Sequence, residues 1–241
     1  MRGHYKIFLG MAAGVGKTYR MLQEGRAEQA AGRDVVIGYL EPHGRAETEA
    51  QAEGLERVAK RTVEYRDTRV EEMDLPAIFQ RAPELCLIDE LAHTNAPGVE
   101  HAKRYEDIED VLDAGVDVFS TVNVQHLESL NDRMAELTGV RVRETFPDRV
   151  LASADEVVLV DLTPEALIAR LRAGKVSPAE RIPAALNNFF RVENLASLRE
   201  VALRQTAEEV ESKRAVPAAE ALGTREDLLA DEAPQALAER V

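Results

Sequence analysis

The sequence predicts an α/β fold in which a mainly parallel sheet carries helices on both faces. Short, almost continuous apolar runs recur through the first two thirds of the chain, and most of them are followed by an amphipathic helical pattern. This alternation is typical of strands that are buried on both faces and joined by right-handed helical crossovers. A glycine-rich loop between the first apolar run and the first helical pattern supports the same class.

Five apolar runs are predicted to be strands, at residues 5–9, 35–40, 85–89, 116–122 and 156–162. The first strand leads through the glycine loop into a helix over about 17–31, which Gly32 is expected to stop. Gly115 is expected to end the helix before the fourth strand in the same way. The stretch "TVEYR" at 62–66 is a further strand candidate.

Beyond the fifth strand the sequence predicts helices. Thr163 and Ser177 each precede a proline, so each is expected to cap a helix that begins at that proline. Asn194 is expected to cap a later helix, and that helix has one apolar face: Leu195, Leu198, Val201, Ala202 and Val210. We expect this face to pack on the domain, and a dimer seam is the alternative.

The predicted organisation has three regions. Residues 1–162 form the α/β core, residues 163–212 a helical extension packed on it, and residues 213–241 an acidic, alanine-rich, loosely attached tail. A chain of 241 residues fits one α/β domain, or one such domain with a small appendage.

The composition excludes several classes of function. The net charge of −14 argues against nucleic acid as a partner, because phosphate backbones need clustered Lys and Arg. No apolar run approaches the ~20 residues of a membrane span, and no signal-peptide pattern is present, so we expect a cytoplasmic chain without direct membrane insertion. The one cysteine, Cys86, lies in "ELCLIDE" and is expected to be a packed core thiol in a reducing compartment.

The glycine loop nearly matches the phosphate-binding (Walker A) pattern of Gly, four residues, Gly-Lys-Ser/Thr. In "FLGMAAGVGKT" the first glycine position of that pattern holds Met11, but the part expected to touch phosphate, "GVGKT", is intact. Gly14, Val15 and Gly16 are predicted to form the phosphate cradle. Lys17 is predicted to reach the β- and γ-phosphates, and Thr18 to ligate Mg²⁺. An ordinary glycine turn is the alternative.

Polar residues follow the other strands at the same predicted edge. Asp89 and Glu90 end the third strand as the acidic residues of a Walker B element do. Asp89 is predicted to hold the Mg²⁺ shell, and Glu90 is the candidate base that activates water. A solvated turn is the alternative. Asn123, at the tip of the fourth strand, is predicted to face the terminal phosphate.

Three further side chains are candidates at this edge. His126 follows the fourth strand, and it either contributes chemistry or caps the next helix. His43 and Arg45 follow the second strand and are candidates for contact with phosphate or with a partner. A loop held by its own hydrogen bonds is the alternative for these two residues.

Five segments together resemble the N-terminal cytoplasmic domain of the KdpD family, and they occur in order from about residue 3 to about residue 210: "GMAAGVGKTYRML", "GYLEPHGRAETEA", "LIDELAHTNAPG", "STVNVQHLESLND" and "ALNNFFRVENLASLRE". Members of this family are sensor histidine kinases that respond to potassium limitation and osmotic stress. The resemblance implies an ATP-binding regulatory domain in two-component signalling, with Gly14, Gly16, Lys17 and Thr18 at the nucleotide and Asp89 and Glu90 at the metal and water.

The resemblance also implies which other domains full-length members of the family carry. Full-length members are anchored in the inner membrane and carry a universal-stress-protein-like domain, four membrane helices and a histidine kinase core. No phosphoacceptor-histidine box follows position 210 in this sequence. We therefore expect a regulatory ATP-binding module that is read by an unidentified signalling protein or kinase partner.

Two other functions remain open from the residues. The first is a slow ATPase, in which Glu90 activates water and an arginine completes the site; the candidates are Arg45, Arg104, Arg141 and Arg143. The second is a small-molecule kinase, which is disfavoured because Arg170, Arg172 and Lys175 are spaced as in an ordinary helix C-terminus. The preference for ATP over GTP rests on the resemblance, and the oligomeric state stays open.

Overall fold

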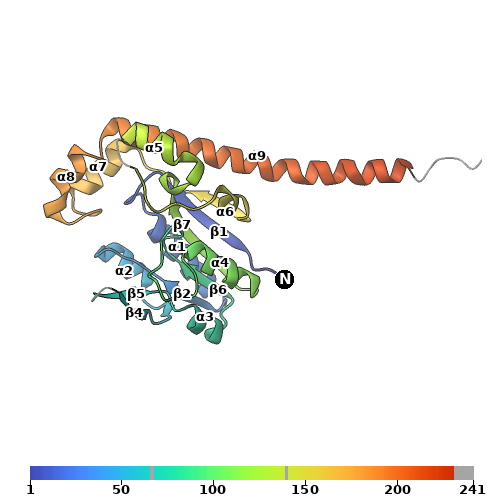
Figure 1. The fold of residues 1–241 in the computed structure, drawn as a ribbon, viewed down its shortest axis with the longest axis horizontal. Helices are drawn as coiled ribbons and strands as arrows, with labels where there is room; N and C mark the ends of the chain where they lie inside the picture. The colour runs from blue at the N-terminus through green and yellow to red at the C-terminus, as the bar shows by residue number, and fades with distance from the viewer. Residues whose placement is uncertain (66–67, 139–140, 231–241) are drawn as a thin grey trace, which may run out of the picture. The chain divides into compact units, whose positions relative to one another are not determined.

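A six-stranded sheet, in which every pair of neighbouring strands is parallel, forms the centre of the fold (Figure 1). The structure is a computed structural model that describes residues 1–65, 68–138 and 141–230, with the backbone alone for 137–138 and 214–230. The chain divides into two units, Met1–Leu203 and Arg204–Val241, and the sheet belongs to the first. The predicted α/β class is confirmed.

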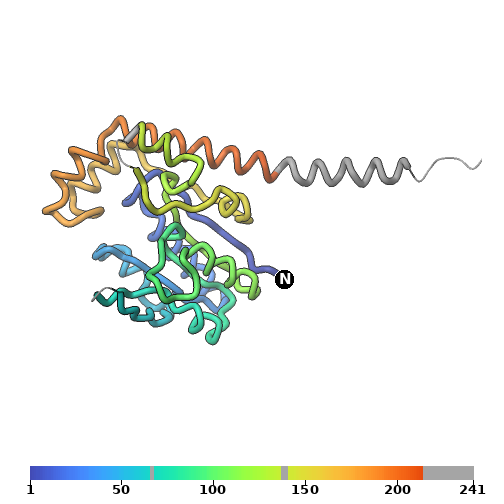
Figure 2. Tube along the Cα trace, viewed as in Figure 1, coloured from blue at the N-terminus to red at the C-terminus, as the bar shows by residue number. Residues whose placement is uncertain are grey.

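The strands follow the order β3-β2-β6-β7-β1-β8. Figure 2 shows the path of the chain, coloured by residue number. Their bounds are β1 (Tyr5–Gly10), β2 (Val35–Tyr39), β3 (Glu56–Arg57), β6 (Leu85–Ile88), β7 (Asp117–Asn123) and β8 (Glu156–Leu159). The fifth predicted strand was expected to reach residue 162, but β8 ends at Leu159. The Val160 N–H still donates to the Leu9 carbonyl oxygen of β1, but β1 turns into the glycine loop after Gly10, so the ladder goes no further.

A separate antiparallel hairpin holds the segment 62–66 that the sequence marked as a strand candidate. Its strands are β4 (Arg61–Tyr65) and β5 (Thr68–Glu72), and residue 66 lies outside the described residues. The hairpin does not join the main sheet. Neither β5 nor the edge strand β3 was predicted, because both are rich in exposed charged residues.

Nine α-helices accompany the strands in the described part of the chain: α1 (Lys17–Ala30), α2 (Ala46–Ala52), α3 (Leu75–Arg81), α4 (Arg104–Asp113), α5 (Asn131–Thr138), α6 (Asp148–Ala152), α7 (Pro164–Arg172), α8 (Ile182–Asn187) and α9 (Val192–Ala230). Three short 3₁₀ turns lie at Val124–His126, Glu128–Leu130 and Ala179–Arg181. Gly32 and Gly115, both with positive φ, follow α1 and α4 and confirm the predicted stops.

Only one of the three predicted caps is present. The Thr163 hydroxyl accepts a hydrogen bond from the Ala166 N–H, which confirms the start of α7. The prediction for Ser177 was wrong: Pro178 is still extended, with ψ of 147°, so the 3₁₀ turn begins only at Ala179. The prediction for Asn194 was also wrong, since this residue lies inside α9 and donates to the carbonyl groups of Asn188 and Phe189.

The apolar face predicted around the start of α9 is mostly confirmed. Leu195, Leu198, Val201 and Ala202 are buried in the first unit. Val210 was expected on the same face, but it belongs to the second unit and is exposed. The region boundaries at 162 and 212 remain predictions, and part of the predicted tail, 231–241, lies outside the described residues.

Two apolar clusters cover the two faces of the sheet, as strand alternation requires. In β1, Ile7 and Leu9 belong to one cluster with Ile108 of α4, whereas Phe8 belongs to the other with Met21 of α1. Cys86 is fully buried, as predicted, and burial raises the pKa of its thiol to about 12. Among the helices of the described residues, none has both the length and the apolar character needed to cross a membrane.

Candidate functional site

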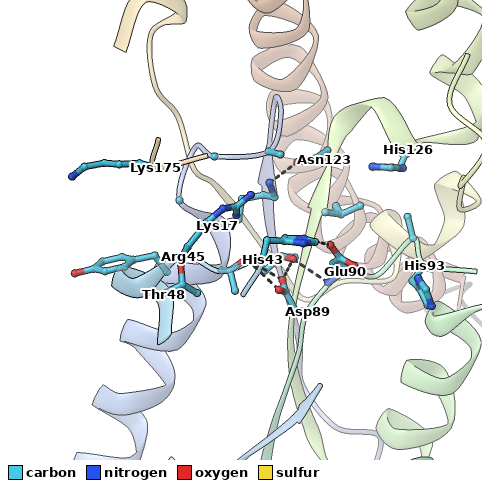
Figure 3. A pocket seen from close by; sticks show the side chains of 18 of the residues that line it. Lys17, His43, Arg45, Thr48, Asp89, Glu90, His93, Asn123, His126 and Lys175 are labelled. Carbon is cyan, nitrogen blue, oxygen red and sulfur yellow. Dashed lines mark hydrogen bonds and ion pairs between the residues drawn. The ribbon is translucent and has the colours of Figure 1, made fainter. Parts of the chain in front are cut away.

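The carboxyl ends of β1, β6 and β7 meet at one edge of the sheet, where a cavity opens (Figure 3). The strand β7 lies between the other two, so the loops after β1 and β6 approach the cavity from either side of it. Most of the side chains predicted from the sequence line this cavity: Gly14, Gly16, Lys17, Thr18, His43, Arg45, Asp89, Glu90, Asn123 and His126. Val15 does not line it and is buried in the core instead.

The glycine loop leaves the N-terminus of α1 open. Gly14 and Gly16 have φ of 89° and 106°, a region that other residues enter at a cost. Gly16 is the N-cap of α1, without a side chain to cap it, and the first turn contains no acidic residue. No hydrogen bond between described residues has the N–H of Gly14 or of Gly16 as its donor. These donors and the helix dipole together favour an anion at this position.

The shifted glycine of the motif lies at the end of β1, behind the cavity. Gly10 still pairs with Asn123 of β7, and a Cβ atom on it would lie 2.7 Å from a methyl carbon of Val15. Met11 is buried in the core, and the residues that line the cavity begin at Ala13. The side chain of Met11 is therefore used for packing.

Lys17 is buried at the base of the cavity. Its Nζ donates to the Ala12 carbonyl oxygen at 3.1 Å and to the Asn123 Oδ1, a contact drawn in Figure 3. Burial lowers the pKa of Lys17 to about 8; Asp89 opposes this shift and Arg45 adds to it. Burial disfavours the charged ammonium form of Lys17. An anion that enters the cavity would stabilise that charged form.

Asp89 and Glu90 are neighbours in different surroundings. Asp89 is 1% exposed and accepts hydrogen bonds from the Thr18 hydroxyl, at 3.1 and 3.3 Å, and from the Thr121 hydroxyl. Burial raises the pKa of Asp89, so a nearby cation would favour its charged form. Glu90 has φ of 59°, and its carboxylate pairs with the His43 Nε2 at 2.9 Å.

The His43 contact lowers the pKa of Glu90. Burial alone would raise the pKa of Glu90, but the hydrogen bond and the charge of His43 bring it below its usual value. The same hydrogen bond raises the pKa of His43. Both shifts favour an ion pair between a charged imidazolium and a carboxylate at the mouth of the cavity.

Of the four arginines considered for hydrolysis, only Arg45 lines the cavity. Arg104 is fully buried; it donates to the Asp89 carbonyl oxygen and to Glu72, and it lies 3.6 Å from the centre of the Tyr39 ring. Arg141 pairs with Asp132 at the surface, and Arg143 is exposed and does not line the cavity. Arg104 therefore holds the backbone at the end of β6 through its hydrogen bond to Asp89, and it does not line the cavity.

His126 lines the cavity, and its position does not decide between the two roles considered for it. Its Nδ1 lies 2.7 Å from the Glu144 carbonyl oxygen. Burial lowers its pKa, so the imidazole is neutral near pH 7.

The cavity also contains residues that the sequence did not reveal. Arg170 and Lys175 were interpreted as an ordinary helix C-terminus, but both line the cavity, together with Glu47, Thr48 and Glu144. Four Lys or Arg residues and four Asp or Glu residues line it, in a chain with 30 basic and 44 acidic residues. No local pattern marks Arg170, because α7 reaches the cavity only through tertiary packing.

The parallel sheet, the glycine loop opening α1 and the acidic end of β6 define an α/β protein of the P-loop-like class. The family model for the KdpD osmosensitive K⁺ channel His kinase sensor domain matches residues 1–210, and the chain belongs to this family.

Known relatives carry the same name. A sensor protein of Synechocystis sp. that bears the KdpD name is 57% identical over 210 residues, which are 87% of this chain and 57% of that protein. Sensor protein KdpD of Escherichia coli K12 is 52% identical over 212 residues, 88% of this chain and 24% of that protein. The chain thus spans a little over half of the first relative and about a quarter of the second.

Among solved structures, a Bacteroides Pif1 bound to single-stranded DNA matches with a TM-score of 0.32 and 14% identity, over 77% of this chain and 46% of that one. At that score the likeness carries no inference about this chain.

Proposed function

We propose that this KdpD-type sensor domain binds Mg²⁺-ATP at the carboxyl edge of its sheet and that its nucleotide state is the signal it passes on. The observation that carries the proposal is the convergence of Lys17, Thr18 and Asp89 at the uncapped N-terminus of α1. A lysine, a hydroxyl and a carboxylate in this order are the groups that P-loop proteins use for phosphate and metal.

The residues present fit the nucleotide. The free N–H groups of Gly14 and Gly16 and the start of α1 would receive phosphate oxygens, and Lys17 would exchange its contact with Asn123 for a phosphate. Asn123 would then be free to contact the terminal phosphate. ATP would bring negative charge into direct contact with the buried Lys17, whose two present hydrogen-bond partners are uncharged.

The residues also fit Mg²⁺. The Thr18 hydroxyl and the Asp89 carboxylate are already hydrogen-bonded to each other, so one ion could be held between them with phosphate oxygens and water. The described residues hold no group of three or more His, Cys, Asp or Glu side chains placed to bind a metal. A metal held mainly by phosphate and water is the usual arrangement for Mg²⁺ at nucleotide sites.

Glu90 is the candidate base within this proposal. Its lowered pKa keeps it ionised near neutral pH, as a proton acceptor must be, and its contact with His43 holds the carboxylate to one side. The reader of the nucleotide state would be an unidentified signalling protein or the kinase part of a KdpD-type sensor.

The test is equilibrium binding of γ-labelled ATP to excess protein with Mg²⁺. Lys17→Ala is expected to weaken binding by about a hundredfold, because a charge-assisted contact to phosphate is lost. Lys103→Ala removes the same charge outside the cavity, where Lys103 contacts Thr94, and is expected to change nothing. If the unaltered protein binds no ATP, the proposal fails.

A further inference from the structure

A second group of cations lines the cavity apart from Lys17. This cationic wall consists of Arg45, in the loop after β2, with Arg170 in the last turn of α7 and Lys175 just after it. The wall therefore joins parts of the chain separated by more than a hundred residues, and neither of the Walker elements contributes to it.

The segment that carries Lys175 lies directly on the glycine loop. A Cβ atom placed on Gly14 would lie 2.5 Å from a methyl carbon of Val176, so these two residues are already in close contact. The Arg45 Nη2 donates to the Val176 carbonyl oxygen at 3.3 Å. Packing thus places the segment after α7 on the glycine loop, and a hydrogen bond joins Arg45 to that segment.

Two donors on the wall are buried and have no partner among the described residues. They are the Nε atoms of Arg45 and Arg170. A buried guanidinium donor without an acceptor costs free energy, and a phosphate oxygen is a well-matched acceptor for it.

Glu47 occupies the place of an anion on the wall. Its carboxylate lies 2.6 Å from the Lys175 Nζ and 3.8 Å from the Arg170 Nη2. Glu47 is on α2 and more than half exposed, so its attachment is weak and an entering anion could replace it.

We infer that the cationic wall is a subsite for the terminal phosphate of a bound nucleoside triphosphate, an inference that rests on the proposed function. The position of Arg45 selects this phosphate. It lines the same cavity as Lys17, Asp89 and Glu90, the residues proposed to hold the terminal phosphate, the Mg²⁺ ion and the water. A diphosphate bound to the same glycine loop would leave Arg170 and Lys175 paired with Glu47.

The subsite has a structural consequence within the first unit. A triphosphate would connect the glycine loop to α7 through the wall, whereas a diphosphate would not. The domain would therefore distinguish the two nucleotides by whether α7 is held to the phosphate chain.

The experiment compares Mg²⁺-ATP and Mg²⁺-ADP binding to the whole chain by calorimetry. The unaltered protein is expected to bind ATP more tightly than ADP. Arg170→Ala is expected to weaken ATP binding about tenfold and ADP binding less than twofold, as the loss of one charge-assisted contact predicts. Arg172→Ala is the matched control, because Arg172 is exposed on the same helix and does not line the cavity.

Two more variants keep the test decisive if Arg170→Ala folds poorly. Arg45→Lys retains the charge but loses the planar fork, and it is expected to lower ATP affinity selectively. Glu47→Gln removes the competing carboxylate and is expected to raise ATP affinity a few-fold, roughly as expected for a weak surface pair.

The outcomes separate the two proposals. If the protein binds both nucleotides and the ATP-to-ADP affinity ratio is the same in all variants, the subsite is refuted and the proposed function stands. If the unaltered protein binds neither nucleotide, both are refuted. Selective loss in Arg170→Ala together with a gain in Glu47→Gln supports the subsite.

Discussion

Asp89 and Glu90 are adjacent in sequence, yet their pKa values shift in opposite directions. Asp89 points into the sheet edge, where burial dominates and two hydroxyls are its side-chain partners. Glu90 adopts a left-handed backbone that turns its side chain toward His43. Two carboxylates in such different surroundings can take different roles, and the proposed function assigns Asp89 to the metal and Glu90 to the water.

Glu90→Gln tests the second of these roles. The variant keeps the size of the side chain but cannot accept a proton, so ATP binding should persist while release of labelled phosphate falls to background. The measurement is separation of bound ATP from free phosphate over time, with Lys103→Ala as the control. Turnover that continues in Glu90→Gln would show that Glu90 is not the base.

The pH dependence of the His43–Glu90 pair has a defined direction. The pKa of His43 is raised, so the contact is complete below the ordinary value of 6.5 and is lost as pH rises through the higher folded value. The pKa of Glu90 is lowered, so its contribution is present above 4.5 and is lost as pH falls through the lower folded value. The pair is therefore intact in mildly acidic solution.

An NMR titration of the His43 ring checks this direction. The pKa of His43 should lie above 6.5 in the unaltered protein and fall in Glu90→Gln, because the charged partner is removed. Equal values in the two proteins would show that the contact does not persist in solution.

At the scale of elements, the loop and the segment after α7 depend on each other through Gly14. Gly14→Ala adds a methyl group to a residue with φ of 89° and places it 2.5 Å from Val176. Gly32→Ala meets a similar backbone penalty, with φ of 97°, but has no neighbour within 4 Å. The two positions therefore separate backbone strain from crowding.

Gly14→Ala is expected to lower the free energy of unfolding by about 1–3 kcal/mol more than Gly32→Ala does, the usual range for overpacking. Urea denaturation of both variants measures the difference. Equal destabilisation would mean that Val176 moves aside without cost and that the segment after α7 is not held on the loop.

The elements differ in how far the sequence determines them. The strands β1, β2, β6 and β7 were predicted to within two residues, because strands buried on both faces produce continuous apolar runs. The hairpin strand β5 is half exposed and charged, so nothing in its pattern separates it from a loop. Helix caps were predicted less accurately than strands. Ser177 and Asn194 have side chains suited to capping, but neither residue occupies an N-cap position.

The site divides in the same way. Five site residues could be placed from the sequence: Lys17, Thr18, Asp89, Glu90 and Asn123. Each lies at or beside the tip of a predicted parallel strand, or in the first turn of the helix that follows the glycine loop. Arg170 and Lys175 could not, because their position depends on how α7 packs. Arg104 is the opposite case. As an arginine it was a candidate for the active site, but in the fold it is buried and packs against the Tyr39 ring.

At the scale of the whole molecule, charge is distributed unevenly. The chain has a net charge of −14. The residues that line the whole cavity, however, include as many Lys and Arg as Asp and Glu residues. An anionic nucleotide would therefore meet a locally balanced site on an acidic protein. The chain spans about a quarter of the Escherichia coli relative, so the proposed signal concerns only the part that the two proteins share.

Cys86 gives a way to follow the opening of the sheet with time. It is the only cysteine in the chain, it is fully buried in β6, and it lies three residues before Asp89. A thiol reagent can reach it only when the sheet opens, so the labelling rate reports the population of open molecules. ATP at a hundred times its dissociation constant should slow labelling about a hundredfold.

A labelling rate that ATP does not change would show that nucleotide binding leaves the sheet's stability unaltered. A rate that falls with ATP concentration would give the dissociation constant without any label on the nucleotide. The natural Cys86 can therefore be used to measure how often the sheet opens, with no added probe.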